Sequence, residues 1–260
     1  MSGDGIAGSA ARPLEGRTAL VTGAARRLGR TIALALARQG ASVVVHCRKT
    51  DDAAEVVGEL DRLGAQSWVL TADFQKPDEC ESLVERALAA AGSLGILVNS
   101  AAIFPQGPLE QITFRDLMQS VEVNAWAPFV LMRSFARLSG KGSIVNLLDT
   151  RIAGGDRSHV AYILSKQLLA SLTEMCALAF APDIRVNGIA PGLILPPPGK
   201  DMAYLEALAD SVPLKRHGGP EDVASAVLYL ATSQFVTGQT IYVDGGRHLE
   251  PDGGVRPPKH

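Results

Sequence analysis

The sequence contains few of the residues on which disulfide-bonded or metal-dependent proteins rely. Its three cysteines are scattered over 260 residues, without the paired spacing of a zinc site or the density of a disulfide framework. The five histidines form no ligand cluster in the sequence either. We therefore expect no metal site and a reducing compartment, most simply the cytoplasm.

The sequence also lacks an excess of charge and a long apolar segment. The 25 basic and 27 acidic residues leave a net charge of −2, which gives no general attraction to nucleic acid or anionic membranes. The N-terminal segment has no basic region followed by an apolar one, and the most apolar stretch, 168–180, is short and contains Glu174. We expect no nucleic-acid partner and no membrane partner, so any positive site must be local.

What the sequence does contain suits one large hydrophobic core. Hydrophobic residues make up 47% of the chain, and it has 26 glycines. This length and composition fit one α/β domain better than two half-sized domains. Small and polar residues at 1–15 and 250–260 predict flexible tails on either side of a domain at 16–249.

Short apolar runs alternate with amphipathic segments along the domain. The runs predict strands at 18–21, 42–46, 66–72, 96–99, 143–147, 184–189 and 240–243. Helical patterns include 28–38, 51–63, 77–91, 114–138 and 159–181. Uninterrupted β-branched and leucine runs are typical of parallel strands buried on both faces. The order predicts an α/β fold, a doubly wound parallel seven-stranded sheet with helices on both faces.

One stretch near the end of this pattern is irregular. Residues 191–200 include three consecutive prolines, Pro196 to Pro198, which cannot form regular helix. A short helix is expected to follow at about 201–210. Because long insertions near the end of such a sheet often cover the substrate, residues 193–211 predict a substrate loop.

The turn between the first strand and the first helix has the features of a phosphate-binding site. Gly23 permits a tight turn, and Gly29 lets the helix pack close to the sheet. The N–H groups and positive dipole end of that helix would face a pyrophosphate. Glycine pairs also occur in turns for geometric reasons, so the prediction depends on the position of this turn after the first strand.

The end of the second predicted strand is basic. A site that prefers NAD usually has an acidic residue here, to accept hydrogen bonds from the ribose 2′-hydroxyl. Arg48, Lys49 and the Thr50 hydroxyl suit a 2′-phosphate instead. Asp51 and Asp52 fit the first turn of the next helix, where negative charge is favoured. The basic tip formed by these residues predicts NADP(H) as the cofactor. The alternative interpretation is a solvated basic loop.

Tyr162 and Lys166 are four residues apart in a helical segment and so share a face. A neighbouring ammonium stabilises phenolate and should lower the pKa of the tyrosine, which suits proton transfer near neutral pH. Such pairs are common by chance. This one follows the fifth strand of a nucleotide-binding pattern, and its position makes it a candidate reactive centre.

Over about residues 16–249 the chain resembles the short-chain dehydrogenase/reductase family, which has a Rossmann-type fold. The segments that carry the resemblance are Thr22-Gly23…Gly29, Asp73-Phe74, Asn99-Ser100-Ala101-Ala102, Asn124, Ser143-Ile144-Val145-Asn146, Tyr162…Lys166, Arg185-Val186-Asn187, Pro191-Gly192 and Val243-Asp244-Gly245-Gly246. The resemblance also implies a homotetramer built through the helices at 114–138 and 159–181, although the sequence leaves a dimer open.

The resemblance implies roles for several of the matching residues. The residues expected to bind the cofactor are Gly23, Arg26, Arg27, Leu28, Gly29, His46, Arg48, Lys49, Thr50, Asp73, Phe74, Asn99, Ser100, Ala101, Tyr162, Lys166, Pro191, Gly192, Leu193 and Ile194. Among them Lys166 would hold the nicotinamide ribose. Asn124 would support a proton-relay water.

Two positions depart from the ordinary family pattern. Arg27 replaces the middle glycine of the turn, and Asp149 stands where a serine is expected, thirteen residues before Tyr162. Both departures resemble the pteridine reductase branch, in which a phenylalanine at the position of Phe104 stacks on the pterin. The implied substrate contacts are Arg27, Phe104, Asp149 and Tyr162. The implied catalytic residues are Asp149, Tyr162, Lys166 and Asn124.

Physical chemistry agrees with this resemblance. A flat pterin could lie between the nicotinamide and Phe104, and Arg27 could donate hydrogen bonds to the pterin carbonyl edge. Asp149 and Tyr162 in contact would titrate as a coupled pair and keep a transferable proton at neutral pH.

The predicted function is NADPH-dependent reduction of dihydropterins, of the dihydrobiopterin, dihydromonapterin or dihydrofolate type, to tetrahydropterins. Hydride would go to ring carbon C6, with N5 protonated through water or through Asp149, Tyr162 and Lys166. One alternative is a general short-chain carbonyl or 3-oxoacyl reductase, against which Asp149 and Arg27 argue. The other is a non-catalytic NADP-binding sensor or scaffold.

Overall fold

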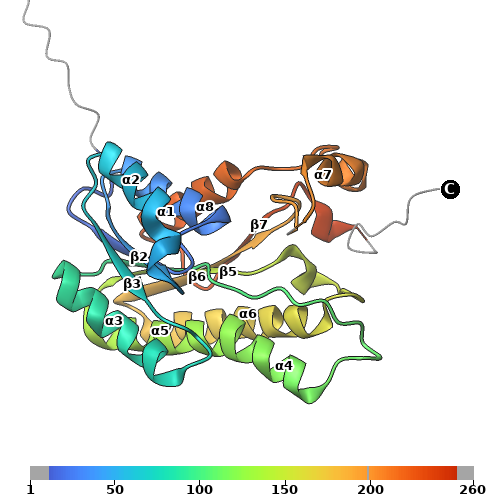
Figure 1. Cartoon of the computed structure of the whole chain (residues 1–260), viewed down its shortest axis with the longest axis horizontal. Helices are drawn as coiled ribbons and strands as arrows, with labels where there is room; N and C mark the ends of the chain where they lie inside the picture. Colours follow the sequence, from blue (N-terminus) through green and yellow to red (C-terminus); the bar gives the residue numbers. More distant parts are fainter. Residues whose placement is uncertain (1–11, 198, 251–260) are drawn as a thin grey trace, which may run out of the picture.

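A computed structural model describes residues 12–197 and 199–250. Their seven strands form a single parallel sheet in the order β3-β2-β1-β4-β5-β6-β7 (Figure 1). The strands are β1 (Thr18–Val21), β2 (Ser42–Cys47), β3 (Ser67–Thr71), β4 (Ile96–Asn99), β5 (Gly142–Leu147), β6 (Ile184–Pro191) and β7 (Thr240–Val243). This topology confirms the predicted doubly wound, Rossmann-type sheet.

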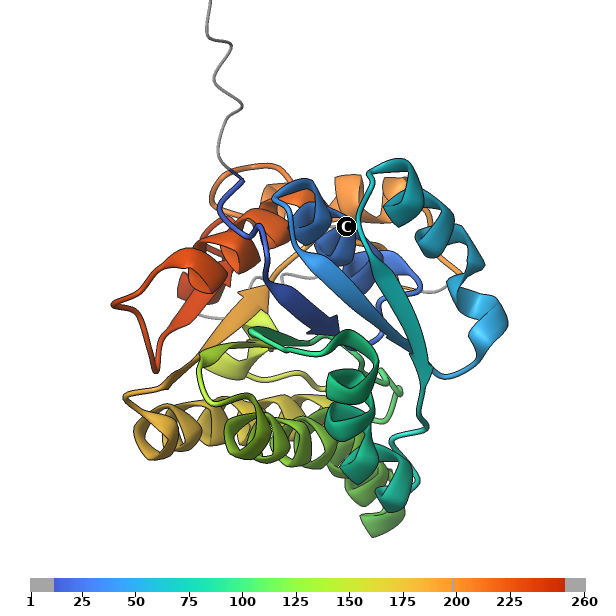
Figure 2. The same ribbon diagram turned by 90° about the vertical axis from the view of Figure 1, so that its left-hand side faces the viewer.

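The described residues form eight α-helices, seven of which cover the two faces of the sheet (Figures 1 and 2). They are α1 (Arg27–Arg38), α2 (Ala54–Arg62), α3 (Pro77–Ala91), α4 (Phe114–Val121), α5 (Ala127–Ser139), α6 (Val160–Phe180), α7 (Met202–Leu208) and α8 (Pro220–Thr232). Helices α1, α2 and α8 lie on one face, and α3 to α6 on the other (Figure 2). α6 is long and apolar enough to cross a membrane by length and composition alone, but it packs against β6 as a core helix.

Alternation along the central strands divides the interior into two cores. Val21 and Val43 face α1 and α8, whereas Leu20, Val44 and Leu97 face α3, α5 and α6. Leu20 pairs with Val44 on one side and with Leu97 on the other, so a layer of aliphatic side chains crosses the sheet. Because both faces are covered, the middle positions of these strands are consecutive apolar residues, as the sequence indicates.

The helix expected at 114–138 has a distinct middle section. The Thr113 side chain caps its start by accepting a hydrogen bond from the Asp116 N–H at 3.2 Å. A π-helical turn, Glu122–Trp126, then separates α4 from α5. Such turns often mark functional positions, and this one contains Asn124.

The packed domain starts before residue 16. Leu14 is fully buried, and its N–H donates to the Gln39 carbonyl at the end of α1 at 3.0 Å. Residues 12–15 therefore belong to the domain rather than to the tail expected at 1–15. The rest of that tail, and residues 251–260, lie outside the described residues.

The loop at 193–211 extends from the carboxyl end of β6 and includes α7 (Figure 1). A small separate apolar cluster joins this loop to the residue that follows it; it consists of Leu193, Leu205 and Val212. The Gly218 N–H anchors the start of the loop by donating to the Leu193 carbonyl at 2.9 Å. The irregular segment followed by a short helix agrees with the sequence pattern.

Candidate active site

The turn between β1 and α1 requires both of its glycines. Gly23 has a φ of +66°, and a Cβ added there would lie 3.0 Å from the Ala101 Cα. A Cβ at Gly29 would lie 2.2 Å from the Gly23 carbonyl oxygen. The Thr22 hydroxyl accepts hydrogen bonds from the N–H groups of Ser100 and Ala101, both at 3.0 Å. The predicted phosphate turn is thus tied to the residues that follow β4.

Arg27 adopts the backbone conformation of the glycine that it replaces in the family pattern. Its φ of +51° lies in the left-handed region, which costs an L-residue about 1–2 kcal/mol. Its Nη2 donates to the Pro196 carbonyl at 2.7 Å, so the exposed side chain joins the turn to the 193–211 loop. Arg26 is also exposed, and Leu28 is half-buried against the core.

His46 lies beneath the turn with both ring nitrogens bonded. The Gly23 N–H donates to Nδ1 at 3.2 Å, so Nε2 carries the proton and donates to the Ala72 carbonyl at 3.0 Å. Burial lowers the pKa of His46 to about 4, and the Phe74 ring stacks on the imidazole at 4.6 Å. The sequence suggests a direct cofactor contact for His46, whereas the structure places this neutral ring as a support for Gly23.

The basic tip at the end of β2 is exposed. Arg48, Lys49 and Thr50 all lie on the surface where β2 leads into a short 3₁₀ turn, Thr50–Ala53. Asp51 and Asp52 occupy the first turn of that element, as expected. Asp73 and Phe74 follow the neighbouring strand β3, on the same edge of the sheet. The tip therefore presents two cations at the carboxyl end of β2, next to the phosphate turn.

Two buried asparagines organise the centre of this edge. The Asn99 side chain donates to the Asn146 Oδ1 at 2.8 Å, which links β4 to β5. Its own Oδ1 is buried and has no hydrogen-bond partner among the described residues. Asn124 clamps the segment after β4, because it accepts from the Ile103 N–H at 2.8 Å and donates to the Ile103 carbonyl at 3.0 Å. Its amide also donates to the Ser165 hydroxyl at 3.1 Å.

The last predicted cofactor segment follows the end of β6. The Gly192 N–H donates to the Val243 carbonyl at 3.0 Å, and a Cβ at Gly192 would lie 2.6 Å from the Asp244 Cβ. Leu193 and Ile194 are buried beside it. Pro191 to Ile194 therefore lie at the same carboxyl edge of the sheet as the phosphate turn.

Tyr162, Lys166 and Asp149 meet at this edge, as the sequence predicts. The Tyr162 hydroxyl donates to the Asp149 Oδ2 at 3.2 Å. Lys166, one turn further along α6, is buried, and its Nζ donates to the Leu147 carbonyl at 2.6 Å. The ammonium lies 5.8 Å from the centre of the Tyr162 ring. A phenol, a carboxylate and an ammonium thus share one buried site.

The pKa of the phenol is shifted opposite to the expected direction. Burial and the Asp149 charge raise the pKa of Tyr162 well above its usual value, and Arg151 opposes them only in part. Burial also lowers the pKa of Lys166 to about 8. The expectation of a lowered Tyr162 pKa is therefore wrong for this structure, because desolvation and the adjacent carboxylate raise it. Tyr162 is a neutral hydrogen-bond donor.

Phe104 lies against the reactive pair. The edge of one ring meets the face of the other in the Phe104–Tyr162 contact, with centroids 4.7 Å apart and an angle of 87° between the rings. The His159 ring stacks on Phe104 at 4.1 Å. Phe104 itself is 38% exposed, so part of its surface remains open to a ligand. The predicted aromatic contact is thus next to the predicted proton donor.

Three charged or titratable residues of this site were absent from the predicted set. Arg151 forms a two-point ion pair with Asp149, through Nε to Oδ1 and Nη2 to Oδ2, both at 2.9 Å. Its Nη1 reaches Asp156, which also contacts the His159 Nδ1 at 3.3 Å. The short spacing from Asp149 to Arg151 was the available sequence signal.

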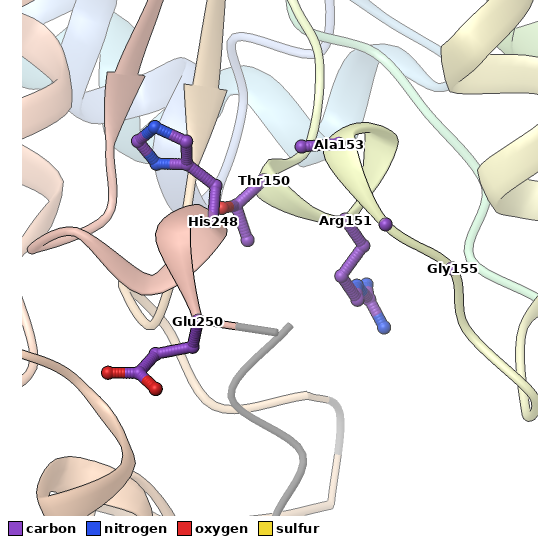
Figure 3. Close-up of a pocket in the computed structure, with 7 residues that line it drawn as sticks. Thr150, Arg151, Ala153, Gly155, His248 and Glu250 are labelled. Atoms are coloured by element: carbon purple, nitrogen blue, oxygen red, sulfur yellow. The ribbon is translucent and has the colours of Figure 1, made fainter. Parts of the chain in front are cut away.

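A pocket lies beside Arg151, between two 3₁₀ turns, η3 (Thr150–Ala153) and η5 (Arg247–Leu249) (Figure 3). Its lining residues are Thr150, Arg151, Ala153, Gly154, Gly155, His248 and Glu250. Asp244 ties the two turns together, because it accepts from the Thr150 hydroxyl at 2.5 Å and contacts the His248 Nδ1 at 2.9 Å. The pocket therefore adjoins the reactive centre through Arg151.

Comparison with known proteins agrees with this fold and site. A family model described as enoyl-(acyl carrier protein) reductase matches residues 23–248. A 3-oxoacyl-[acyl-carrier-protein] reductase of Staphylococcus epidermidis is 32% identical over 246 residues, covering 90% of this chain and 99% of the relative. An uncharacterized oxidoreductase of Mycobacterium tuberculosis is 33% identical, covering 90% and 92%. The chain therefore belongs to the short-chain dehydrogenase/reductase family of oxidoreductases.

A solved structure points to a narrower relationship. The FolM alternative dihydrofolate reductase 1 from Brucella canis, complexed with NADP, superposes with a TM-score of 0.87 at 30% identity. The match covers 96% of this chain and 99% of that protein. The corresponding protein from Brucella suis, also in complex with NADP, gives a TM-score of 0.86.

Proposed function

We propose that this protein is an NADPH-dependent reductase of dihydropterins. The observation that carries the proposal is the hydrogen bond from the Tyr162 hydroxyl to the Asp149 carboxylate at 3.2 Å. In the ordinary family pattern a serine hydroxyl occupies this position and holds the substrate oxygen. A carboxylate there favours a substrate with N–H donors over one that develops negative charge on oxygen.

The residues present fit a dinucleotide carrying a 2′-phosphate. Lys166 is fully buried but donates only to the Leu147 carbonyl among the described residues, so its other N–H groups can donate to ribose hydroxyls. The glycine turn presents its helix N-terminus, and Arg48 and Lys49 offer positive charge at the β2 tip. The two Brucella structures bound to NADP support the same cofactor.

The cofactor and the protein side chains would have separate roles in the reaction. Bound NADPH would supply hydride. Phe104 would pack against the flat ring, since its surface is partly exposed beside Tyr162. Tyr162, neutral and hydrogen-bonded, would pass a proton toward the substrate nitrogen, and the buried Lys166 ammonium would stabilise the charge that remains. Arg27 would extend from the turn toward the 193–211 loop, where the variable part of the substrate would lie.

A second function is favoured by the sequence relatives. A 3-oxoacyl-[acyl-carrier-protein] reductase is 32% identical to this chain, and its name describes reduction of a ketone. The Asp149 carboxylate would lie where the oxyanion of such a substrate develops. Repulsion between these two negative charges would raise the activation barrier for ketone reduction. We therefore rank carbonyl reduction second. A non-catalytic NADP-binding role is third, because the Tyr162 hydroxyl is bonded to Asp149 and the Lys166 ammonium lies 5.8 Å from the Tyr162 ring centre, an arrangement that suits proton transfer.

A substrate panel tests the proposal directly. NADPH oxidation is followed with dihydrobiopterin, dihydromonapterin, dihydrofolate, a 3-oxoacyl thioester and simple ketones. We expect turnover with at least one dihydropterin. Asp149→Ser, which restores the usual family residue, should lose this activity and gain ketone reduction. Rapid ketone reduction by the wild-type enzyme with no dihydropterin turnover would contradict the proposal, and tight NADPH binding without any turnover would favour the sensor.

We also propose that the protein is a homotetramer. Large apolar side chains are exposed along α4 to α6, including Phe114, Trp126, Met175 and Leu178. An exposed apolar surface of this kind is typical of a subunit interface. Light scattering coupled to size-exclusion chromatography measures the mass, and a monomer would contradict the proposal.

A further inference from the structure

Arg151 connects the reactive pair to the aromatic contact. It binds Asp149 through three N–H groups, because the backbone N–H also donates to Oδ1, at 2.9 Å. Asp149 accepts these hydrogen bonds together with the one from Tyr162. Asp149 therefore acts as the acceptor in all of its hydrogen bonds among the described residues.

The opposite end of the guanidinium organises the Phe104 platform. Its Nη1 pairs with Asp156, and Asp156 accepts from the Ser158 N–H at 2.6 Å and the His159 N–H at 2.8 Å. The His159 ring in turn stacks on Phe104. The network therefore runs from Tyr162 through two carboxylates to the ring that covers part of Phe104.

Burial makes this network rigid. The side chains of Arg151, Asp149 and Asp156 are only 18%, 14% and 11% exposed. Burial by itself would lower the pKa of Arg151, but its bonds to Asp149 and the charges of both carboxylates raise it above its usual value. The guanidinium also lies 5.2 Å from the Phe104 ring centre and 5.8 Å from that of Tyr162, so it packs against both rings.

Two other cations act on Asp149. The negative charge of Asp149 acts to raise the pKa of Lys166 on α6 and that of Arg247 on η5. Arg151 makes the two-point ion pair with Asp149, with one hydrogen bond to each carboxylate oxygen. Removing Arg151 would leave Asp149 with weaker electrostatic support and with freedom to rotate away from Tyr162.

We propose that Arg151 is a positioning residue of the reaction: it holds Asp149 as an accepting carboxylate, so that Tyr162 carries the transferable proton. The proposal rests on the proposed function for the identity of the substrate. Asp156 and His159 extend the same constraint to Phe104. The geometry thus couples the orientation of the proton donor to the surface on which the flat substrate would pack.

The first test measures the environment of the Asp149 carboxylate without any substrate. The enzyme is labelled at the aspartate side-chain carboxyl carbons, and the Asp149 resonance is assigned from its loss in Asp149→Asn. In Arg151→Met we expect this resonance to shift at pH 7, because the carboxylate loses two charge-assisted hydrogen bonds. Arg157→Met removes an exposed arginine from the same segment and should leave the resonance unchanged.

The second test uses kinetics with whichever substrate the wild-type enzyme reduces. Arg151→Met should lower kcat by about 10²-fold or more, the scale of general acid–base catalysis, while the Kd for NADPH changes less than about twofold. The pH profile of kcat should differ from that of the wild-type enzyme in Arg151→Met and should be unchanged in Arg157→Met. Guanidine added to the buffer should restore part of the lost activity to Arg151→Ala.

An Asp149 resonance that is the same in Arg151→Met and in the wild-type enzyme would overturn the proposal, whatever happens to kcat. If Arg151→Met fails to fold, Asp156→Asn removes the carboxylate that pairs with the Arg151 Nη1, and it should shift the Asp149 resonance and change the KM of the flat substrate. An Asp149 resonance and a KM identical to those of the wild-type enzyme in Asp156→Asn would then overturn it. Failure of the pterin assignment is distinguishable, because it appears in the substrate panel of the wild-type enzyme and does not alter the resonance.

Discussion

Lys166 should make the folded protein less stable at neutral pH than an uncharged residue would. Its side chain is fully buried, and burial lowers its pKa from the ordinary value of 10.5 to about 8. Among the described residues its Nζ donates only to the Leu147 carbonyl. A buried ammonium with two N–H groups left for a ligand is costly until the ligand arrives.

The magnitude follows from the two pKa values. Because the folded pKa is the lower one, the unfolded chain binds more protons between pH 8 and 10.5, and the free energy of unfolding rises with pH across that window. Below pH 8 the full cost applies, about 3 kcal/mol. Lys166→Met removes it but leaves the Leu147 carbonyl without this donor, which costs about 1 kcal/mol. The variant should therefore be about 2 kcal/mol more stable at pH 7, a Tm increase of about 4–8 °C.

Urea denaturation of both proteins at matched concentration, at pH 7 and at pH 10.5, measures the difference. The stabilisation should shrink at the higher pH, and the variant should have lost its reductase activity. Lys141→Met is the matched control, because the Lys141 side chain is 84% exposed and its removal should change little. A Lys166→Met protein that is less stable than the wild-type protein at pH 7 would refute the reasoning.

Other predictions address separate parts of the site. Replacing Arg48 and Lys49 with glutamate should weaken NADPH binding far more than NADH binding in fluorescence titrations, and equal losses would remove the 2′-phosphate assignment. Phe104→Ala should raise the KM of the flat substrate by about tenfold, from the loss of an aromatic contact of about 1.4 kcal/mol; an unchanged KM would place the substrate elsewhere. The folded pKa of His46 is about 4, below the ordinary 6.5, so stability should fall as the pH drops from 6.5 toward 4, where the unfolded chain binds the extra proton. His46→Gln should flatten this part of the curve, and parallel curves would mean that another group titrates.

The sheet was predictable because its strands are short, apolar and buried on both faces. Runs such as 18–21 and 96–99 match β1 and β4 residue for residue. Where a run ends in residues of mixed character the bounds shifted: β6 continues to Pro191, beyond the expected end at 189. The inclusion of residues 12–15 in the domain was not foreseeable from composition, since it depends on the burial of a single side chain, Leu14.

The candidate site was predictable where local spacing defines it and not where the tertiary structure does. Tyr162 and Lys166 share a helix, and Asp149 follows β5 at a recognisable distance from them. The shift in the pKa of Tyr162 depends on desolvation, which the sequence does not display. His46 was assigned to the cofactor by its position at the end of β2, but only the folded chain shows that its ring bonds to the Gly23 N–H.

The network around Arg151 follows from the replacement of serine by Asp149. A carboxylate next to a buried phenol makes ionisation of both groups unfavourable, and it would turn toward water if nothing held it. The 3₁₀ turn η3 brings the Arg151 N–H and guanidinium back onto Asp149 within two residues, and Asp156 balances the charge that the arginine adds. A serine would require neither partner, since it carries no charge. Restoring the serine should therefore leave Arg151 and Asp156 as a buried pair that a carboxylate no longer connects to the Tyr162 hydroxyl.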